Sequence, residues 1–323
     1  MFANDCSYDK IPYDIVECKA HRDINRRMAQ ESMVLLKNDG ILPLKNADGL
    51  KIAVIGPNAD NKNVLLGNYN GTPSKYKTLL CGLTDMADEF NSEIIYAYGC
   101  HLFDETIHEW AEHPEREAII AAQQADVVIM CMGLDPSMEG EEGDSYNGAI
   151  SGDKKDLELP NPQKKLFEAV FNVGKPIIFV NVSGSCINLF RQEETCAAIV
   201  QCFYPGAEGG NALADIIFGK TSPSGRLPVT FYCSTDKLPD FTDYSIKNRT
   251  YRFCKDNVLY KFGHGLTYSE IEENWNGSEV EIINKGIYNT LYTVLKYDEN
   301  DGRLVDFRKI WIEAGQKTLI NFK

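Results

Sequence analysis

The stretch DVVIMCMGLDPSMEGEEGD occupies residues 126–144 and joins an apolar run to a cluster of acidic side chains. Its first part, residues 126–132, shows no polar alternation, which is typical of a strand buried on both faces of a sheet. A second run of this kind, PIIFVNV, spans residues 176–182. Such strands occur in parallel sheets covered by helices on both faces, so the two runs indicate an α/β fold.

Outward from these runs, strand-like and helix-like segments alternate about six times. Further strands are predicted at residues 51–55, 93–98 and 197–203, and helices at 19–37, 74–90, 105–124, 163–172 and 210–218. The alternation predicts an α/β sandwich with a mostly parallel sheet and helices on both faces. Chemistry in such folds lies beyond the carboxyl ends of the strands. The loops that matter are therefore those after Ile55, Met132, Val182 and Phe203.

The first predicted helix, residues 19–37, has an apolar face made by Ala20, Ile24 and Met28, which recur four residues apart. Asn38-Asp39-Gly40 is expected to end it, because glycine suits the left-handed position that follows a helix.

The chain divides by texture into four parts. Residues 1–18 form a turn-rich lead-in, residues 19–270 the α/β sandwich, residues 271–277 a linker, and residues 278–323 a small β module. The module contains the short β-type runs EVEIIN, TLYTVLKY, RKIWIEA and KTLINF, too few for a complete seven-stranded sandwich.

Composition excludes several classes of function. The formal net charge of −14 argues against a nucleic-acid partner, because phosphate binding needs clustered Lys and Arg. No apolar stretch reaches the roughly 18 residues that a membrane span needs, and no signal-peptide pattern opens the chain. The ten cysteines lack zinc-ligand spacing and are expected to be reduced thiols, which favours a cytoplasmic setting. No metal or cofactor is expected.

The acidic loop, residues 133–163, is the richest candidate site. Its carboxylates include Asp135, Glu139, Glu141, Glu142, Asp144, Asp153 and Asp156. Long loops in compact domains are usually functional or disordered, and crowded carboxylates can hold one proton near neutrality. Three interpretations stay open: a solvated acidic loop, a general acid/base site, and a cation site that lacks the usual calcium-loop spacing.

A second candidate is the glycine-rich segment FYPGAEGGNALADIIFGK, residues 203–220. It is either a tight turn into a helix or a phosphate-binding loop, but it matches neither G-x-G-x-x-G nor the full G-x-x-x-x-G-K-[ST] pattern. Residues 182–185 (VSGS) follow a buried strand, yet no G-x-S-x-G elbow is present for a serine hydrolase.

Several strings in order resemble glycoside hydrolase family 3. They are ESMVLLKNDGILPL (31–44), KIAVIGPNAD (51–60), YPGAEGGNALADIIFGKTSPSGRLPVTF (204–231), YKFGHGLTYS (260–269) and VDFRKIWIEAGQKTLINF (305–322). The resemblance implies the C-terminal part of such an enzyme: an α/β sandwich followed by a fibronectin type III-like module. The (β/α)8 barrel that precedes the sandwich in the family is expected to be missing, and residues 1–18 resemble the lead-in from it.

The resemblance also implies an activity and site residues. Family members hydrolyse β-glycosides with retention, using an Asp nucleophile from the barrel and, in many members, a Glu acid/base from the sandwich. The family's E-x-E pattern falls on Glu139, preferred as general acid, with Glu141 and then Glu142 as alternatives. The family's Asp-Arg pair has no match here, because Asp144 precedes Ser145. The EGEE run leans toward β-xylosidase-type members over β-glucosidases.

The expected function is the acid/base-bearing portion of a retaining β-glycoside hydrolase, acting on a β-linked oligosaccharide and inactive without its barrel. The alternative is a non-catalytic module that binds sugar or pairs with a separate barrel chain.

Overall fold

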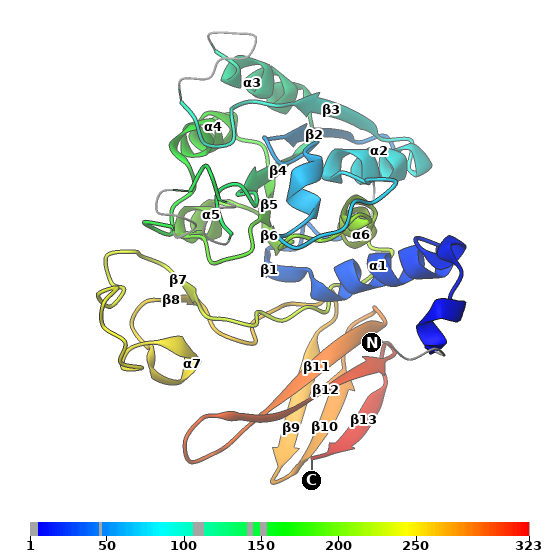
Figure 1. The fold of residues 1–323 in the computed structure, drawn as a ribbon, viewed down its shortest axis with the longest axis vertical. Helices are drawn as coiled ribbons and strands as arrows, with labels where there is room; N and C mark the ends of the chain where they lie inside the picture. Colours follow the sequence, from blue (N-terminus) through cyan, green and yellow to red (C-terminus); the bar gives the residue numbers. More distant parts are fainter. Residues whose placement is uncertain (1–5, 45–46, 106–112, 141–144, 149–153, 323) are drawn as a thin grey trace.

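The computed structural model describes residues 6–44, 47–105, 113–140, 145–148 and 154–322. Figure 1 shows an α/β part above a small β module. The helices are α1 (Lys19–Ser32), α2 (Leu79–Glu89), α3 (Glu115–Gln124), α4 (Asn161–Phe171), α5 (Phe190–Thr195), α6 (Gly209–Ile217) and α7 (Thr250–Phe253), with 3-10 turns η1 (Ser7–Lys10), η2 (Tyr13–Ile15) and η3 (Lys62–Leu65). The strands are β1 (Val34–Asn38), β2 (Lys51–Ile55), β3 (Glu93–Ala97), β4 (Val127–Gly133), β5 (Ile177–Val182), β6 (Ala198–Gln201), β7 (Phe231–Tyr232), β8 (Val258–Tyr260), β9 (Ile271–Asn276), β10 (Glu279–Asn284), β11 (Thr290–Tyr297), β12 (Leu304–Ile312) and β13 (Lys317–Asn321).

The main sheet has six strands in the order β1-β6-β5-β4-β2-β3. Strands β2 to β6 pair in parallel, and only β1 runs antiparallel to its neighbour β6. The prediction of a mostly parallel sheet in an α/β fold is therefore confirmed. β4 and β5, the two apolar runs, are buried along their whole length and lie next to each other in the sheet.

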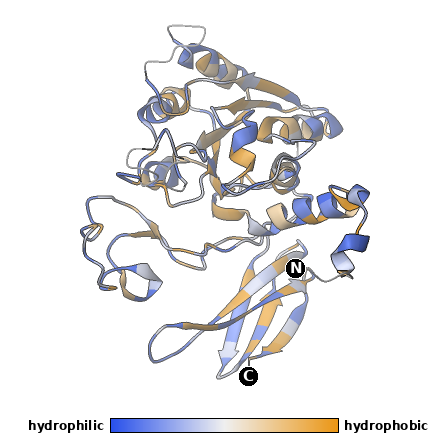
Figure 2. Ribbon diagram, in the orientation of Figure 1, coloured by the Kyte–Doolittle hydropathy of each residue, from blue (hydrophilic) through white to orange (hydrophobic). Residues whose placement is uncertain are grey.

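Alternate residues of each strand enter two cores on opposite faces of the sheet. Ile52 and Val54 of β2 pack with residues of α1, α2 and α6. Ala53 and Ile55 pack on the other face with residues of α3 and α4. This explains why the strand sequences show no polar alternation, since side chains that point in either direction are buried. Figure 2 shows these strands as the apolar centre of the α/β part.

The prediction of one helix over residues 19–37 is wrong for its last five residues, 33–37. α1 ends at Ser32, and β1 follows at once as the antiparallel edge strand. Val34 and Leu35 alternate between the two cores and are fully buried. A run that buries consecutive residues on opposite sides fits the period of a strand and not that of a helix.

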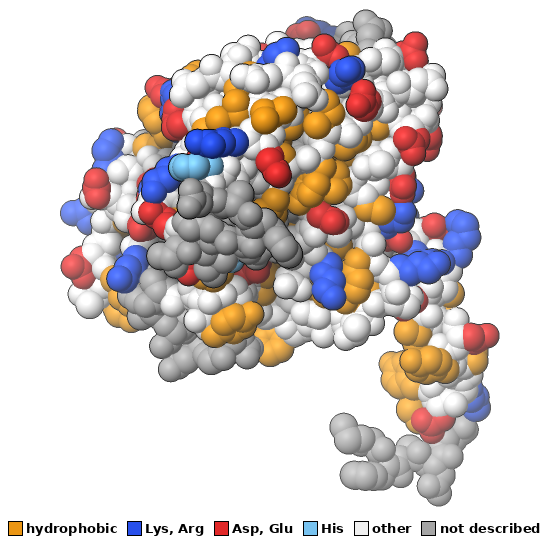
Figure 3. Space-filling model, turned by 90° about the horizontal axis from the view of Figure 1, so that it is seen from above, with side chains coloured by type: hydrophobic (Ala, Val, Ile, Leu, Met, Phe, Trp, Pro, Cys, Tyr) orange, Lys and Arg blue, Asp and Glu red, His pale blue; other side chains and the backbone are white. Residues whose placement is uncertain are grey.

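The apolar face predicted for α1 is also placed differently. Ile24 and Met28 are 50% and 61% exposed, whereas Ala29 on another face packs into the core. The lead-in before α1 likewise turns apolar side chains outward, including Tyr8 and Tyr13. Figure 3 shows these orange side chains on the arm that projects from the body. An apolar surface of this size on an exposed helix and its lead-in is typical of a face that another domain covers.

The C-terminal module consists of two small antiparallel sheets, β13-β10-β9 and β11-β12. They enclose a separate core made by Val280, Ile282, Val294, Ile312 and Phe322. The predicted linker, residues 271–277, is wrong, because residues 271–276 form β9 and pair with β10 along its length. Trp275 holds this polar strand in place by stacking on Phe322, with ring centroids 5.6 Å apart.

In the described parts of the chain, no helix is both long and apolar enough to cross a membrane. All ten cysteines are unpaired, and four of them, Cys100, Cys131, Cys196 and Cys202, are buried.

The segment after β8 is bonded to the edge strand β1 through His264. The ring Nε2 lies 2.7 Å from the carbonyl oxygen of Leu36 in β1, and the ring stacks on Tyr260 at 5.0 Å. Burial is the largest influence on His264 and lowers its pKa below the usual value; the neighbouring Arg226 lowers it too, while the bond to Leu36 and the charge of Glu193 act against them.

Acidification is expected to destabilise the fold through His264. Because the folded-state pKa is depressed, the unfolded chain binds the proton more readily once the pH falls below about 6.5. The free energy of unfolding should therefore decrease from pH 7 to pH 5, by at most about 1.4 kcal/mol per pH unit for this group. Urea unfolding followed by circular dichroism should show a shallower pH slope for His264→Gln, whose amide can still donate to Leu36. Equal slopes for the two proteins would contradict this assignment.

Candidate functional site

The predicted loops meet at the carboxyl edge of the main sheet. β4 and β5 are neighbours, and Gly133 at the end of β4 lies against Val182 at the end of β5. A Cβ on Gly133 would lie 2.0 Å from the Val182 carbonyl oxygen, and its φ of +134° is one that side-chain-bearing residues rarely adopt. Only glycine allows the chain to leave β4 here, so the acidic loop starts directly beside the segment that follows β5.

Two described segments of the acidic loop, residues 135–139 (the first leg) and residues 145–148 (the second leg), are hydrogen-bonded to each other. Asp135 accepts from the backbone N–H and the hydroxyl of Ser137 at 2.9 and 2.6 Å. Ser137 in turn accepts from Asn147, from its side-chain amide at 2.9 Å and from its backbone N–H at 2.8 Å. These bonds close the base of the loop between residues 135–139 and residues 145–148.

Glu139 lies at the inner end of the first leg and faces the segment after β5. Its Oε1 accepts from the backbone N–H of Gly184 and from that of Ser185, the latter at 3.0 Å. Its Oε2 accepts from the Ser185 hydroxyl at 3.0 Å. The structure thus connects the acidic loop to a partner 46 residues further along the chain.

Two further side chains complete the surroundings of Glu139. Tyr204, after β6, places its ring within contact distance of Gly184, and burial raises the pKa of its phenol, which the Glu139 charge raises further. Lys154 donates to the carbonyl oxygen of Cys186 at 2.7 Å. Burial lowers the pKa of Lys154, and the charge of Glu139 opposes that shift. Glu139 therefore sits between a phenol that stays protonated and a half-buried ammonium group.

The remaining predicted residues are placed as follows. Glu141, Glu142, Asp144 and Asp153 lie outside the described residues. Asp156 accepts from the backbone N–H of Glu158 at 2.9 Å, away from Glu139. Among the described residues, no group of three or more His, Cys, Asp or Glu side chains is arranged to hold a metal ion.

Sequence reasoning missed the partners of Glu139, namely Gly184, Ser185, Tyr204 and Lys154. From the sequence, residues 182–185 were interpreted only as a poor match to a serine-hydrolase elbow. In the structure Ser183 donates to the carbonyl oxygen of Ser185 at 2.8 Å, and Ser185 serves Glu139. The only signal in the sequence was position, since these residues follow a buried strand that is the neighbour of β4.

The glycine-rich segment before α6 is a tight turn and not a phosphate cradle. The N–H groups of Gly206 and Gly210 donate to the carbonyl oxygens of Leu65 and Lys77, at 2.7 and 2.9 Å. A bound phosphate would need these donors, and they are already used inside the fold.

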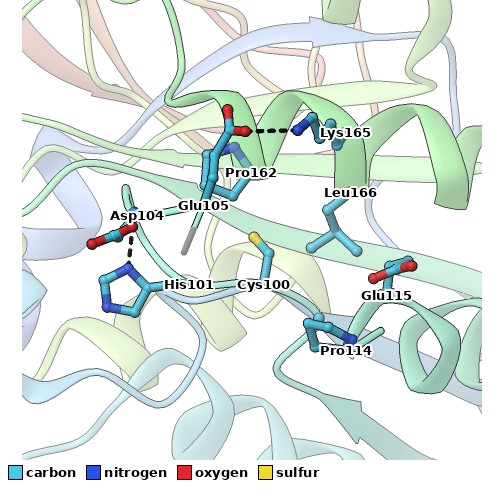
Figure 4. Close-up of a pocket in the computed structure, with 10 residues that line it drawn as sticks. Cys100, His101, Asp104, Glu105, Pro114, Glu115, Pro162, Lys165 and Leu166 are labelled. Carbon is cyan, nitrogen blue, oxygen red and sulfur yellow. Dashed lines mark hydrogen bonds and ion pairs between the residues drawn. The ribbon is translucent and has the colours of Figure 1, made fainter. Parts of the chain in front are cut away.

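Another cavity, of about 240 Å³, opens between the segment after β3 and α4 (Figure 4). His101 Nδ1 accepts from the backbone N–H of Asp104 at 3.0 Å, and Lys165 pairs with Glu105 at 2.8 Å. Burial raises the pKa of the Cys100 thiol to about 12, so it is not an activated nucleophile. Before Pro162, no residue of the acidic loop lines this cavity. The two pairs just described, His101 with Asp104 and Lys165 with Glu105, are bonded within the cavity lining.

The chain is similar to a known protein family and to several characterised enzymes. A family model, the glycosyl hydrolase family 3 C-terminal domain, matches residues 33–268. A xylan 1,4-β-xylosidase of Xylanibacter ruminicola is 30% identical, with 98% of this chain and 54% of that protein covered. A β-xylosidase of Formosa agariphila is also 30% identical, with 99% and 47% covered.

Solved structures give the same result for the fold. A family 3 exo-β-xylosidase, determined with a xylobiose aziridine probe, has a TM-score of 0.83 at 26% identity, covering 98% of this chain and 45% of its own. A β-glucosidase from Erythrobacter marinus has a TM-score of 0.79 at 31% identity, covering 95% and 45%. The chain spans about half the length of the relatives that it matches.

Proposed function

The chain belongs to glycosyl hydrolase family 3, and from that premise we propose that it is the acid/base-bearing portion of a retaining β-glycoside hydrolase of β-xylosidase or β-glucosidase type. The observation that carries the proposal is the acidic loop, fixed at the carboxyl edge of the sheet by Glu139 and followed in sequence by Glu141 and Glu142. The substrate is a β-linked oligosaccharide or glycoside. No metal or cofactor is required for the two-carboxylate chemistry.

The second carboxylate is proposed to come from a (β/α)8 barrel domain or chain. Retention needs two carboxyl groups about 5–5.5 Å apart, one as nucleophile and one as acid/base, on opposite sides of the scissile bond. The exposed apolar residues of the lead-in and of α1 support a covering partner at the start of this chain. The sugar would then be enclosed between the barrel and the acidic loop.

The acid/base is proposed to lie on the acidic loop, among Glu139, Glu141 and Glu142. The family resemblance alone prefers Glu139 over the other two. The same proposal assigns residues 1–18 to the connection from the barrel, residues 19–270 to the sandwich, and the two small sheets that follow to a fibronectin type III-like module. The names of the relatives support the enzyme; no observation favours a non-catalytic sugar-binding module.

A reconstitution assay tests this function. The chain alone is expected to show no turnover of aryl β-xylosides or aryl β-glucosides above background, because the proposed barrel, which would position the glycoside opposite the acidic loop, is left out of this measurement. Mixing it with the barrel domain of a related β-xylosidase should restore hydrolysis of one of these substrates. Replacing Glu139, Glu141 and Glu142 together by Gln should then lower kcat by about 10²–10⁴-fold, the usual contribution of general acid/base catalysis.

The matched control is Glu281→Gln, which removes a carboxylate that pairs with Lys317 at 2.8 Å in the β module and should leave kcat unchanged. Turnover by the chain alone that the triple substitution abolishes would show that the barrel is dispensable and would overturn this part of the proposal. Full activity of the triple variant with the barrel would place the acid/base elsewhere.

A further inference from the structure

We propose that Glu139 is a positioning residue, which ties the acidic loop to the Gly184–Ser185 segment, and that it is not the proton donor itself. The inference rests on the proposed function for its catalytic meaning, but its structural part stands on the described contacts alone. Both carboxylate oxygens of Glu139 accept from the segment after β5, where two backbone N–H groups and one hydroxyl donate to them.

These contacts leave Glu139 poorly placed to act as an acid. A general acid must direct an O–H group at the glycosidic oxygen of the substrate. Any such rotation of the Glu139 carboxyl would break bonds to Gly184 and Ser185, whose N–H groups would lose their acceptor. Hydrogen bonds to a carboxylate are about twice as strong as neutral ones, so this anchor is costly to release.

The neighbours of Glu139 show what the anchor holds. At Gly140 a Cβ would lie 2.2 Å from the side-chain nitrogen of Asn68 and 2.8 Å from the Ser145 hydroxyl. The chain therefore leaves Glu139 in contact with the segment after β2, and a larger residue at position 140 would have to displace the Asn68 and Ser145 side chains. Asn147 then donates to Ser137 in residues 135–139, from its side-chain amide and from its backbone N–H.

Both ends of the intervening stretch are thus fixed to the domain. The sequence places Glu141 and Glu142 within that stretch. They remain the candidates for the proton donor in the proposed function.

Glutamine and alanine separate the two roles at position 139. Glu139→Gln keeps an oxygen that accepts from Gly184 and Ser185 and an amide that can donate to the Ser185 hydroxyl, so it preserves the anchor but carries no acidic proton. Glu139→Ala removes both functions. A positioning residue is therefore rescued by Gln, whereas a proton donor is not.

The first arm measures amide hydrogen exchange in the 323-residue chain. The N–H groups of Gly184 and Ser185 should be protected in the wild type and in Glu139→Gln, and should exchange at least about tenfold faster in Glu139→Ala, as loss of a charge-assisted bond implies. Glu281→Ala is the control for a carboxylate lost elsewhere and should not change exchange at these sites. Unchanged exchange in Glu139→Ala would overturn the proposal.

The second arm uses the chain reconstituted with a barrel domain. Glu139→Gln should stay within about tenfold of the wild-type kcat, and Glu139→Ala should lose about 100-fold or more, without rescue by azide. Equal losses in the two variants, restored by azide, would make Glu139 the proton donor and overturn the proposal. Absence of turnover in the reconstituted wild type would contradict the proposed function instead. The hydrogen-exchange measurement would still decide whether Glu139 holds the Gly184–Ser185 segment.

Discussion

Replacing Gly210 with leucine is expected to leave the chain unfolded under conditions in which the wild type is native. Gly210 in α6 and Gly82 in α2 face each other where the two helices cross. A Cβ on Gly210 would lie 1.9 Å from the carbonyl oxygen of Thr78, and one on Gly82 would lie 2.1 Å from the Gly210 carbonyl carbon. These neighbours are backbone atoms, which no side-chain rotation can move aside.

The loss in the free energy of unfolding depends on how little space lies between α2 and α6 where they cross. Overpacking a core costs about 1–3 kcal/mol and occasionally more, and domains have only about 5–15 kcal/mol of stability. Gly210→Ala should therefore lower the free energy of unfolding by about 3 kcal/mol, and leucine, with three more carbons, should force α2 and α6 apart. Leu79, Leu83 and Leu213 pack into the same core and would lose their contacts.

Urea unfolding followed by circular dichroism measures the alanine variant, and one-dimensional NMR shows whether the leucine variant has a native core. The control is Gly71→Ala, because a Cβ there meets nothing within 4 Å. It should change the free energy of unfolding by less than about 0.5 kcal/mol. A Gly210→Ala variant as stable as Gly71→Ala would show that the helices separate without cost.

Replacing Asp215 with alanine should be the second most damaging change, lowering the free energy of unfolding by about 2–3 kcal/mol. Asp215 lies in α6 and is 3% exposed. Arg26 of α1 donates to its two oxygens from Nε and Nη2, at 2.7 and 2.6 Å, and Gln30 donates from its side-chain amide at 2.6 Å. The bond to Asp215 is the main reason why the pKa of Arg26 is raised.

The expected loss is smaller than the 3–5 kcal/mol typical of breaking a fully buried pair, because the Arg26 side chain is 39% exposed and can be rehydrated. Asp215→Asn, which keeps the shape and one acceptor, should cost less than Asp215→Ala. A double-mutant cycle with Arg26→Met isolates the pair. A coupling energy near zero would mean that α1 is held by Ala29 and its apolar neighbours alone.

This pair has a consequence beyond stability. It fixes α1 to the sandwich with Ile24 and Met28 facing outward. Loosening α1 in Asp215→Ala should therefore also increase cleavage by trypsin after Arg22 and Arg27, and should weaken reconstitution with a barrel domain that uses this face.

Much of the fold followed from local patterns. The continuous apolar runs at β4 and β5 predict buried parallel strands, because side chains on both faces of such a strand must be apolar. The pattern did not separate α1 from β1, because Met33, Val34 and Leu35 fit the apolar requirement of either element. It also did not reveal β9, a polar strand that depends on pairing with β10 and on the stacking of Trp275 over Phe322.

The candidate site was predicted only in part. The sequence placed a carboxylate-rich loop after β4, and the family resemblance promoted Glu139 within it. Neither predicted that Gly184 and Ser185, which follow β5, would donate to that carboxylate, nor that Tyr204 and Lys154 would lie beside it.

The sequence by itself determined the alternation of strands and helices, the parallel sheet and the loop that carries the acidic residues. These properties are encoded locally, because the spacing of apolar residues along an element indicates which of its sides are buried. The bonds from Gly184 and Ser185 to Glu139 and the exposure of Ile24 and Met28, by contrast, depend on the tertiary structure. The partners of a side chain depend on which loops the crossover connections bring to one edge of the sheet. Residues 139 and 184 are in contact because β4 and β5, which precede them, are neighbours in the sheet.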